Sequence, residues 1–151
     1  MQLTKHTDYA LRVLMYVARK RARCTVADIA AGYQIPRSHV MKLVHQLAGL
    51  GYLETVRGKG GGVTLARRPG EINVGRVVRE TEETLDVLDC LSEGYAGGCG
   101  IAPSCTLKSA LRGAQQAFYR ELDRYTLADI VPGERRATIA WHARRPAAAT
   151  R

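Results

Sequence analysis

Three of the four cysteines in the chain, Cys90, Cys99 and Cys105, lie within one short stretch of the sequence. The residues between them are small and turn-forming, with four glycines in 94–100 and a proline at 103. Such residues let a loop curl around a small group. Because thiolates are good ligands for soft metal ions and for iron–sulfur clusters, this segment is a candidate metal site.

The spacing of the triplet, C-x8-C-x5-C, narrows the choice of metal. Structural zinc sites usually pair cysteines about two to four residues apart and close with four protein ligands, whereas no fourth cysteine or histidine lies near this triplet. Three thiolates fit an iron–sulfur cluster in which one iron takes another ligand. A redox-active disulfide and a triplet that binds nothing remain open alternatives.

Other cysteine and histidine side chains are weaker candidates. His39 and His45 are six residues apart on a predicted helix, so they do not converge on one face and are not expected to share a metal. Cys24 stands alone in the sequence, and we expect it to be a half-buried apolar residue.

Charge is divided unevenly along the 151 residues, which are enough for one domain with an appendage. Residues 1–70 contain twelve Lys and Arg against three Asp and Glu, whereas residues 71–131 contain six against ten. A basic front half favours contact with a polyanion, although a solvated basic surface would have the same composition.

No run of residues approaches the roughly 18 to 20 apolar positions that a membrane span requires. The opening residues 1–6 also lack the apolar segment of a signal peptide. We therefore expect a cytoplasmic protein with no membrane partner. Thiols stay reduced in that compartment, so clustered cysteines indicate metal or redox chemistry rather than structural disulfides.

The front half has the pattern of a winged helix-turn-helix. Apolar periodicity predicts helices over about 7–20, 26–31 and 36–50, with Gly32 ending the second helix. Two predicted strands, 52–56 and 63–65, flank a glycine-rich loop. Together these elements place the helix-turn-helix at about 26–51 and the wing at 52–66.

In such a fold the third helix presents polar and basic side chains to base edges, and the wing reaches an adjacent groove or phosphate. The predicted DNA-binding residues are Arg37, Ser38, His39, Lys42, Arg57 and Lys59. A winged helix that contacts only other proteins is the alternative.

The back half adds further helices, so the predicted fold class is mainly α. Asn73 is placed to cap a helix over 74–81, and a longer helix is predicted over 106–125, after the cysteine loop 89–105. The longer helix carries an apolar seam close to that of a coiled coil, formed by Leu107, Leu111, Ala114, Phe118 and Leu122. Residues 127–131 make a last turn. We expect one domain over 1–131 and a disordered basic tail over 132–151.

Several motifs occur together in a recognisable order. They are the opening 2–12, the wing loop 57–62, the segment 74–80 and the cysteine triplet. In this combination the chain resembles the winged-helix iron–sulfur repressors of the IscR and NsrR kind. The stretches 105–111 and 121–129 are similar specifically to the nitric-oxide-sensing group of that family, and the resemblance covers about residues 1–131.

The resemblance implies a homodimer that pairs through the long helix and binds double-stranded operator DNA. It also implies an iron–sulfur cluster bound by Cys90, Cys99 and Cys105, with 4Fe–4S preferred and 2Fe–2S open. In some members of the nitric-oxide-sensing group an aspartate on the first helix of the second subunit supplies the fourth ligand, and Asp8 matches that position. The gap between Cys90 and Cys99 is longer than is usual in this group.

The function implied is a transcriptional repressor that leaves its operator when nitric oxide nitrosylates the cluster. A regulator that responds to iron–sulfur status or redox state is the main alternative. A thiol redox enzyme is disfavoured because no cysteine pair has the C-x-x-C spacing. A zinc-stabilised adaptor protein is the remaining alternative, and it would bind no operator.

Overall fold

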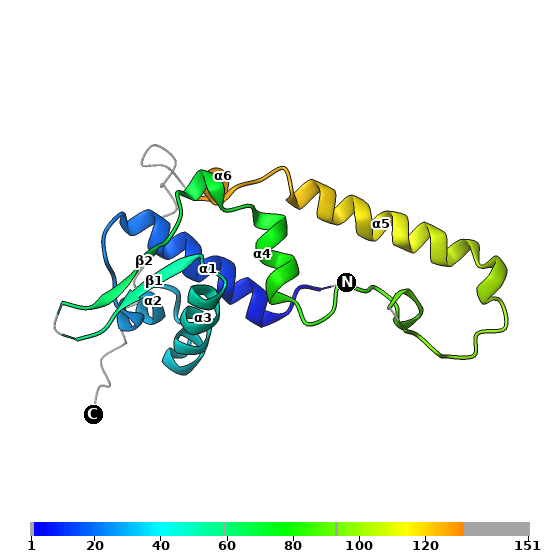
Figure 1. The fold of residues 1–151 in the computed structure, drawn as a ribbon, viewed down its shortest axis with the longest axis horizontal. Helices are drawn as coiled ribbons and strands as arrows, with labels where there is room; N and C mark the ends of the chain where they lie inside the picture. Colours follow the sequence, from blue (N-terminus) through cyan, green and yellow to red (C-terminus); the bar gives the residue numbers. More distant parts are fainter. Residues whose placement is uncertain (1, 59, 93, 132–151) are drawn as a thin grey trace, which may run out of the picture.

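The computed structural model describes residues 2–58, 60–92 and 94–131, and it has a winged-helix head from which one long helix projects (Figure 1). The helices and strands, in chain order, are α1 (Lys5–Lys20), α2 (Val26–Tyr33), α3 (Arg37–Gly49), β1 (Leu53–Val56), β2 (Gly62–Leu65), α4 (Val74–Thr81), α5 (Thr106–Leu122) and α6 (Leu127–Ile130). Single 3-10 turns occupy Pro69–Glu71, Asp89–Leu91 and Ala102–Ser104. The predicted mainly α fold with a small hairpin is confirmed.

The first helix begins at Lys5, two residues before the predicted start. Thr4 acts as the N-cap, since its side-chain oxygen accepts a hydrogen bond from the backbone N–H of Thr7 at 3.2 Å. The helix ends where Arg21 takes a left-handed conformation, with φ of 49°. Its buried face therefore starts with Thr7, a residue that becomes important for the contacts described below.

The second helix runs through Gly32 to Tyr33, so the prediction that Gly32 ends it is wrong. A Cβ atom at this position would collide with the ring of Tyr16. Gly32 is thus required for the close approach of α2 to α1, and the helix ends at Gln34, whose φ is 55°. At the other end Thr25 and Asp28 form a capping box.

The wing is an antiparallel hairpin in which Leu53 pairs with Leu65 and Val56 pairs with Gly62. Its turn uses Gly58 and Gly60 at positive φ, 93° and 80°, where side-chain-bearing residues would be strained. Cys24 extends the hairpin through a bridge to Val63, with backbone bonds of 3.1 and 2.7 Å. The wing is therefore attached to the chain that leads into α2.

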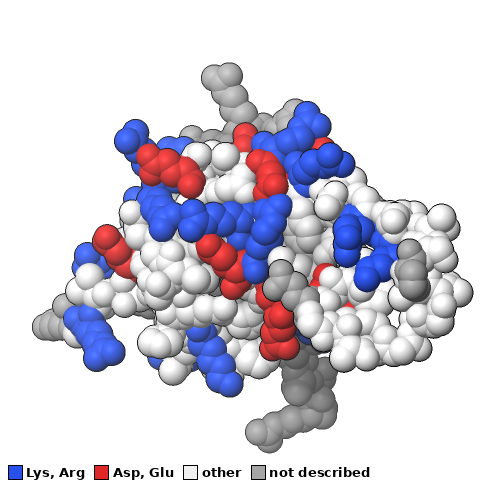
Figure 2. Space-filling model, turned by 45° about the vertical axis from the view of Figure 1, so that its right-hand side comes forward, with Lys and Arg blue, Asp and Glu red and all other residues white. Residues whose placement is uncertain are grey.

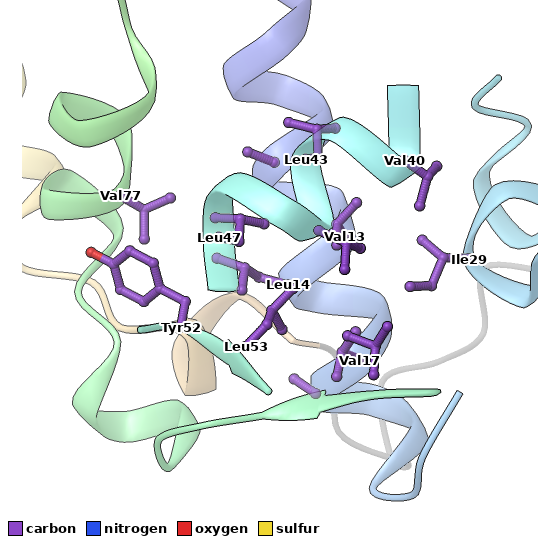
Figure 3. Close-up of a cluster of buried hydrophobic side chains, with 14 of the residues drawn as sticks. Val13, Leu14, Val17, Ile29, Val40, Leu43, Leu47, Tyr52, Leu53 and Val77 are labelled. Carbon is purple, nitrogen blue, oxygen red and sulfur yellow. The ribbon is translucent and has the colours of Figure 1, made fainter. Parts of the chain in front are cut away.

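The core of the head forms where α1 and α3 cross above the wing (Figure 3). Its fully buried side chains include Val13 and Leu14 from α1, together with Val40, Leu43 and Leu47 from α3. The three α3 positions recur three and four residues apart, so they share one face of that helix. The helical periodicity of the apolar residues thus fixes which face of α3 points outward.

Two contacts secure α4 to the back half. Asn73 caps α4 by accepting from the N–H of Arg76 at 2.9 Å, and its amide donates to the carbonyl of Asp123 at 2.7 Å. Arg79 forms a two-point ion pair with Asp123, at 2.6 and 2.7 Å. The predicted cap at Asn73 is confirmed, and the start of α4 is also joined to the residues after α5.

The long helix α5 ends at Leu122, three residues before the predicted end. It packs against α4 and the turn at Asp89–Leu91, and otherwise extends away from the head (Figure 1). None of its residues is buried, and Leu107 on the predicted seam is 59% exposed. In the described part of the chain no helix is long and apolar enough to cross a membrane. The predicted tail, 132–151, lies outside the described residues.

Candidate nucleic-acid interface and cysteine site

The outward face of α3 carries the predicted reading residues. Arg37, Ser38, His39 and Lys42 are all exposed, while the opposite face of the helix is buried in the core. Pro36 precedes the helix, and the N–H of His39 donates to its carbonyl at 2.9 Å. A helix held by one face and polar on the other can enter a major groove.

A cavity of about 330 Å³ lies beside this face, between the start of α1 and the start of α3. Its polar lining comes from Lys5, His6 and Tyr9 on α1 and from His39 and Lys42 on α3. The rings of Tyr9 and His39 lie 6.2 Å apart between centroids. No acidic residue is among the described residues that line the cavity, so it suits an anion such as a backbone phosphate.

Sequence reasoning missed Lys5 and His6, because they precede the first predicted helix and follow no periodic pattern. His6 also joins α1 to the reading helix, with its Nε2 atom 2.6 Å from Oε1 of Gln46. The clustering of basic residues in the first half of the chain was the only available signal for Lys5.

On the wing, Arg57 is exposed, as predicted. Lys59, the other predicted wing contact, lies outside the described residues. Arg23 donates from Nη1 to the carbonyl of Gly60 at 3.0 Å, so the wing turn is fastened to the segment before α2. This bond restricts how far the turn can move relative to the head.

The three candidate ligand cysteines are all free thiols on the segment between α4 and α5. Cys99 is exposed, whereas Cys90 and Cys105 are half-buried. Over the residues that the structure describes, no group of three or more His, Cys, Asp or Glu side chains is close enough to hold a metal ion. One copy of the chain therefore does not bring the predicted ligands together by itself.

The chemistry of the segment nevertheless fits a thiolate-bound group. Cys105 caps α5, and its Sγ accepts a hydrogen bond from the N–H of Lys108 at 3.3 Å. Hydrogen bonds to the sulfur atoms help to set the reduction potential of iron–sulfur clusters. Residues 94–105 contain no charged side chain, and the lobe at the right of Figure 2 carries few charges. Cys24, in contrast, is buried and only 4% exposed rather than half-buried, and burial raises the pKa of its thiol.

Asp8, the predicted fourth ligand, lies on the first turns of α1 and is not grouped with the cysteines. Its Oδ1 atom accepts from Nε of Arg12 at 2.8 Å, and its side chain is 45% exposed. This hydrogen bond to the Asp8 carboxylate raises the pKa of Arg12. The carboxylate is accessible to a second copy of the chain.

The start of α1 is hydrogen-bonded to the start of the segment between α4 and α5, residues 82–105, which we call the cysteine segment. Oε1 of Glu82, the residue after α4, accepts from the N–H of Thr4 at 2.8 Å and from its hydroxyl at 3.2 Å. One turn further, the buried hydroxyl of Thr81 donates to that of Thr7 at 3.1 Å. We call these contacts, with the His6–Gln46 bond, the α1 junction.

A second connection joins the winged-helix head, which we also call the reading head, to α4. The hydroxyl of Tyr52 points toward α4 (Figure 3) and donates to Oε2 of Glu80 at 2.5 Å, while Arg76 donates to Oε1 at 2.8 Å. Burial, followed by the bond to Glu80, raises the pKa of Tyr52. Burial alone would raise the pKa of Glu80, but the bonds from Tyr52 and Arg76 outweigh it and lower the pKa.

The exposed basic helix, the adjoining basic cavity and the glycine-tipped wing define a winged helix-turn-helix DNA-binding protein. More particularly, the chain belongs to the Rrf2 family, described as iron-dependent transcriptional regulators, whose family model matches residues 3–133.

Curated relatives cover nearly the whole chain. The HTH-type transcriptional regulator NsrR of Geobacillus kaustophilus is 46% identical over 141 residues, which is 92% of this chain and 94% of that protein. The regulator of the same name from Bacillus subtilis is 43% identical over 133 residues, or 87% and 90%. The prediction of a transcriptional regulator rather than an enzyme is therefore confirmed.

Solved structures with the same fold are more distant in sequence. IscR of T. potens has a TM-score of 0.68 and 23% identity, with 85% of each chain covered. CymR, the global cysteine regulator of B. subtilis, has a TM-score of 0.68 and 21% identity, covering 87% of this chain and 96% of that one. At these identities the likeness establishes the fold.

Proposed function

We propose that the chain is a nitric-oxide-sensing repressor that acts as a homodimer on operator DNA. The observation that carries this proposal is the place of three free thiols on the segment that connects the α1 junction to α5. Their chemical state therefore bears on both the reading head and the long helix. The relatives named NsrR support the same function, and residues 1–131 form its working unit.

Cys90, Cys99 and Cys105 would hold an iron–sulfur cluster, 4Fe–4S by preference over 2Fe–2S. When bound, such a cluster supplies iron that reacts directly with nitric oxide. Asp8 of a second copy is our candidate for the fourth ligand, because its half-exposed carboxylate is not part of any cysteine group within its own chain. A carboxylate is a poor match for iron that thiolates already bind, so it leaves that position open to exchange.

DNA contact would come from the exposed face of α3, through Arg37, Ser38, His39 and Lys42, and from Arg57 and Lys59 on the wing. In a dimer the two reading helices lie in successive major grooves of a roughly palindromic site. To these residues the cavity beside α3 adds Lys5 and His6 as contacts to a flanking phosphate.

The α1 junction provides the route from the thiols to the DNA. While the cysteine segment is fixed by its bound group, Glu82 stays hydrogen-bonded to Thr4, and Thr81 stays hydrogen-bonded to Thr7. The bond between His6 and Gln46 then keeps α3 aligned with α1. Release of the segment frees Glu82 and with it the first turn of α1. The two reading heads then lose the fixed spacing that a palindrome requires, and the operator is released.

The proposal is tested by anaerobic purification with iron and sulfide assays, followed by nitric oxide titration of the same sample. We expect a brown protein whose visible absorption collapses at a few nitric oxide molecules per cluster, together with loss of operator binding. Asp8→Ala should change the spectrum or the nitric oxide reactivity of the cluster. A colourless protein would refute the nitric-oxide function. So would a cluster whose absorption is unchanged by nitric oxide but changes with iron supply or oxidation.

The basic cavity gives a separate prediction about the DNA interface. Lys5→Ala should weaken binding by a similar factor for every DNA sequence and reduce the slope of log affinity against log salt by about one unit, because one phosphate contact is lost. Fluorescence anisotropy with labelled duplexes at several salt concentrations measures this slope. Arg120→Ala, an exposed change on α5, is the matched control, and an unchanged slope for Lys5→Ala would remove the cavity from the interface.

A further inference from the structure

Large exposed hydrophobic side chains occur in two groups in the part of the chain that is described. Five of them, Leu88, Tyr95, Ile101, Leu107 and Tyr125, lie on the cysteine segment, on α5 or just after it. The other two are in the winged-helix head: Met41, 56% exposed, and Val56, 49% exposed at the end of β1. Both of these lie on elements that we propose to contact DNA, α3 and the wing.

Met41 lies in the middle of the reading face of α3. It is one helical turn from Arg37 and Ser38 on one side and from His45 on the other, and Lys42 follows it directly. Residues three and four apart share a helix face, so Met41 forms a stripe with Ser38 and His45. The core side of α3 is already filled by Val40, Leu43, Val44 and Leu47, and packing of the head does not require Met41.

We propose that Met41 contacts the C5-methyl group of a thymine in the major groove and so helps to specify the operator. This inference rests on the proposed function, because it requires that α3 reads DNA. Among the groups that base pairs present in the major groove, the thymine methyl is the apolar one, and apolar side chains recognise it. A methionine side chain is flexible and polarizable, and adapts to such a contact.

The neighbours of Met41 argue for DNA over a protein partner. Arg37 and Lys42 flank it on the exposed face, and the nearby cavity adds Lys5. The three acidic residues of positions 1–70, in contrast, lie off α3: Asp8 is paired with Arg12, Asp28 is in the capping box of α2, and Glu54 is on β1. An apolar side chain surrounded by cations matches an apolar group surrounded by phosphates.

The experiment exchanges thymine for deoxyuridine, which removes only the methyl group. The full-length protein, purified anaerobically with its iron, first selects duplexes from a random library. Each thymine of the selected site is then replaced singly, and affinity is measured for the wild type, Met41→Ala and Met41→Leu. At one thymine in each half-site we expect the wild type to lose about fourfold, the effect of exposing one methyl group.

The variants should separate methyl contact from general affinity. Met41→Ala should bind the thymine duplex about as weakly as the wild type binds the uracil duplex, and should no longer distinguish the two. Met41→Leu should restore the discrimination. Lys42→Ala is the contrasting change: it should weaken binding to both duplexes by one factor and leave their ratio unchanged.

Two results would overturn the inference. One is a wild type that shows no thymine dependence at any position of the selected site; the other is a Met41→Ala variant that keeps the wild-type dependence. Both leave operator binding itself intact, since selection has already succeeded by then. Failure of the wild type to enrich any duplex would instead refute the proposed function. Because Met41 is exposed, its variants should unfold at the wild-type temperature, which circular dichroism checks.

Discussion

Replacing Cys99 with alanine should remove both the colour of the protein and its tight binding to the operator, while leaving the fold intact. Cys99 is exposed, so the substitution removes no core packing, and the free energy of unfolding of the iron-free protein should change by less than about 0.5 kcal/mol. With only two of the three proposed thiolate ligands left, the protein should no longer retain the iron of a cluster. Operator affinity should then fall toward the nonspecific level, by roughly 10³ or more.

The measurements are visible absorption, iron and sulfide content, and anisotropy of a labelled operator, all on anaerobic samples. Cys24→Ala is the matched control, because it removes the one cysteine outside the segment. Its thiol is buried, with Sγ 3.7 Å from the carbonyl oxygen of Val63. This variant should therefore be somewhat less stable, but it should still bind iron and the operator. A Cys99→Ala protein that stays brown and binds tightly would contradict the role of the segment.

The winged-helix head could be predicted from its sequence because its elements are amphipathic and bounded by strong local signals. The spacing of Val40, Leu43 and Leu47 determines both the helix and its buried face, and thereby the exposure of Arg37 and Lys42. Glycines at positive φ mark the wing turn in the same local way.

The errors arise where tertiary contacts override local signals. Gly32 looks like a helix breaker, but it serves the packing of α2 on the ring of Tyr16, which no local pattern reveals. Cys24 is buried because its backbone pairs with Val63, 39 residues later. The α1 junction also lay beyond sequence reasoning, since Thr4 and Glu82 are 78 residues apart.

The cysteine site is predictable in composition but not in geometry. Residue type and spacing identify Cys90, Cys99 and Cys105 as candidates, whereas in our proposal their assembly depends on the bound cluster and on Asp8 of a second copy of the chain. In the described residues of one copy they do not form a metal-binding group, and Asp8 is paired with Arg12 instead. If a second chain supplies the fourth ligand, as we propose, that ligand leaves no spacing signal within one sequence.

The long helix leads to the second large effect: Leu107→Asp should convert the protein to a monomer. The apolar seam of α5 is partly uncovered in a single chain: Leu107 is 59% exposed and Ala114 is exposed, while the other three seam residues are half-buried. Burying such a seam against a second copy is the contact that a coiled-coil pattern favours. A carboxylate at Leu107 costs the monomer nothing, because the side chain already faces solvent, but it would be buried without a partner in the dimer.

Size-exclusion chromatography with light scattering, at micromolar concentration, reports the mass of each variant. Gln116→Asp is the control: Gln116 is exposed on the opposite face of α5, so a charge there should leave the dimer unchanged. Loss of the dimer separates the two reading heads, and operator affinity should then fall by about 10² to 10⁴, the advantage that two linked binding sites have over one.

The same variant distinguishes two roles of α5. If the helix only holds the two heads together, Leu107→Asp should still bind half-site DNA with the affinity and salt dependence of one wild-type head. If Asp8 of a second copy completes the cluster, the monomer should also bind iron less tightly, although Cys90, Cys99 and Cys105 are unchanged. A Leu107→Asp protein that remains dimeric would show that subunits pair through a different surface, and the exposed seam of α5 would then need another partner.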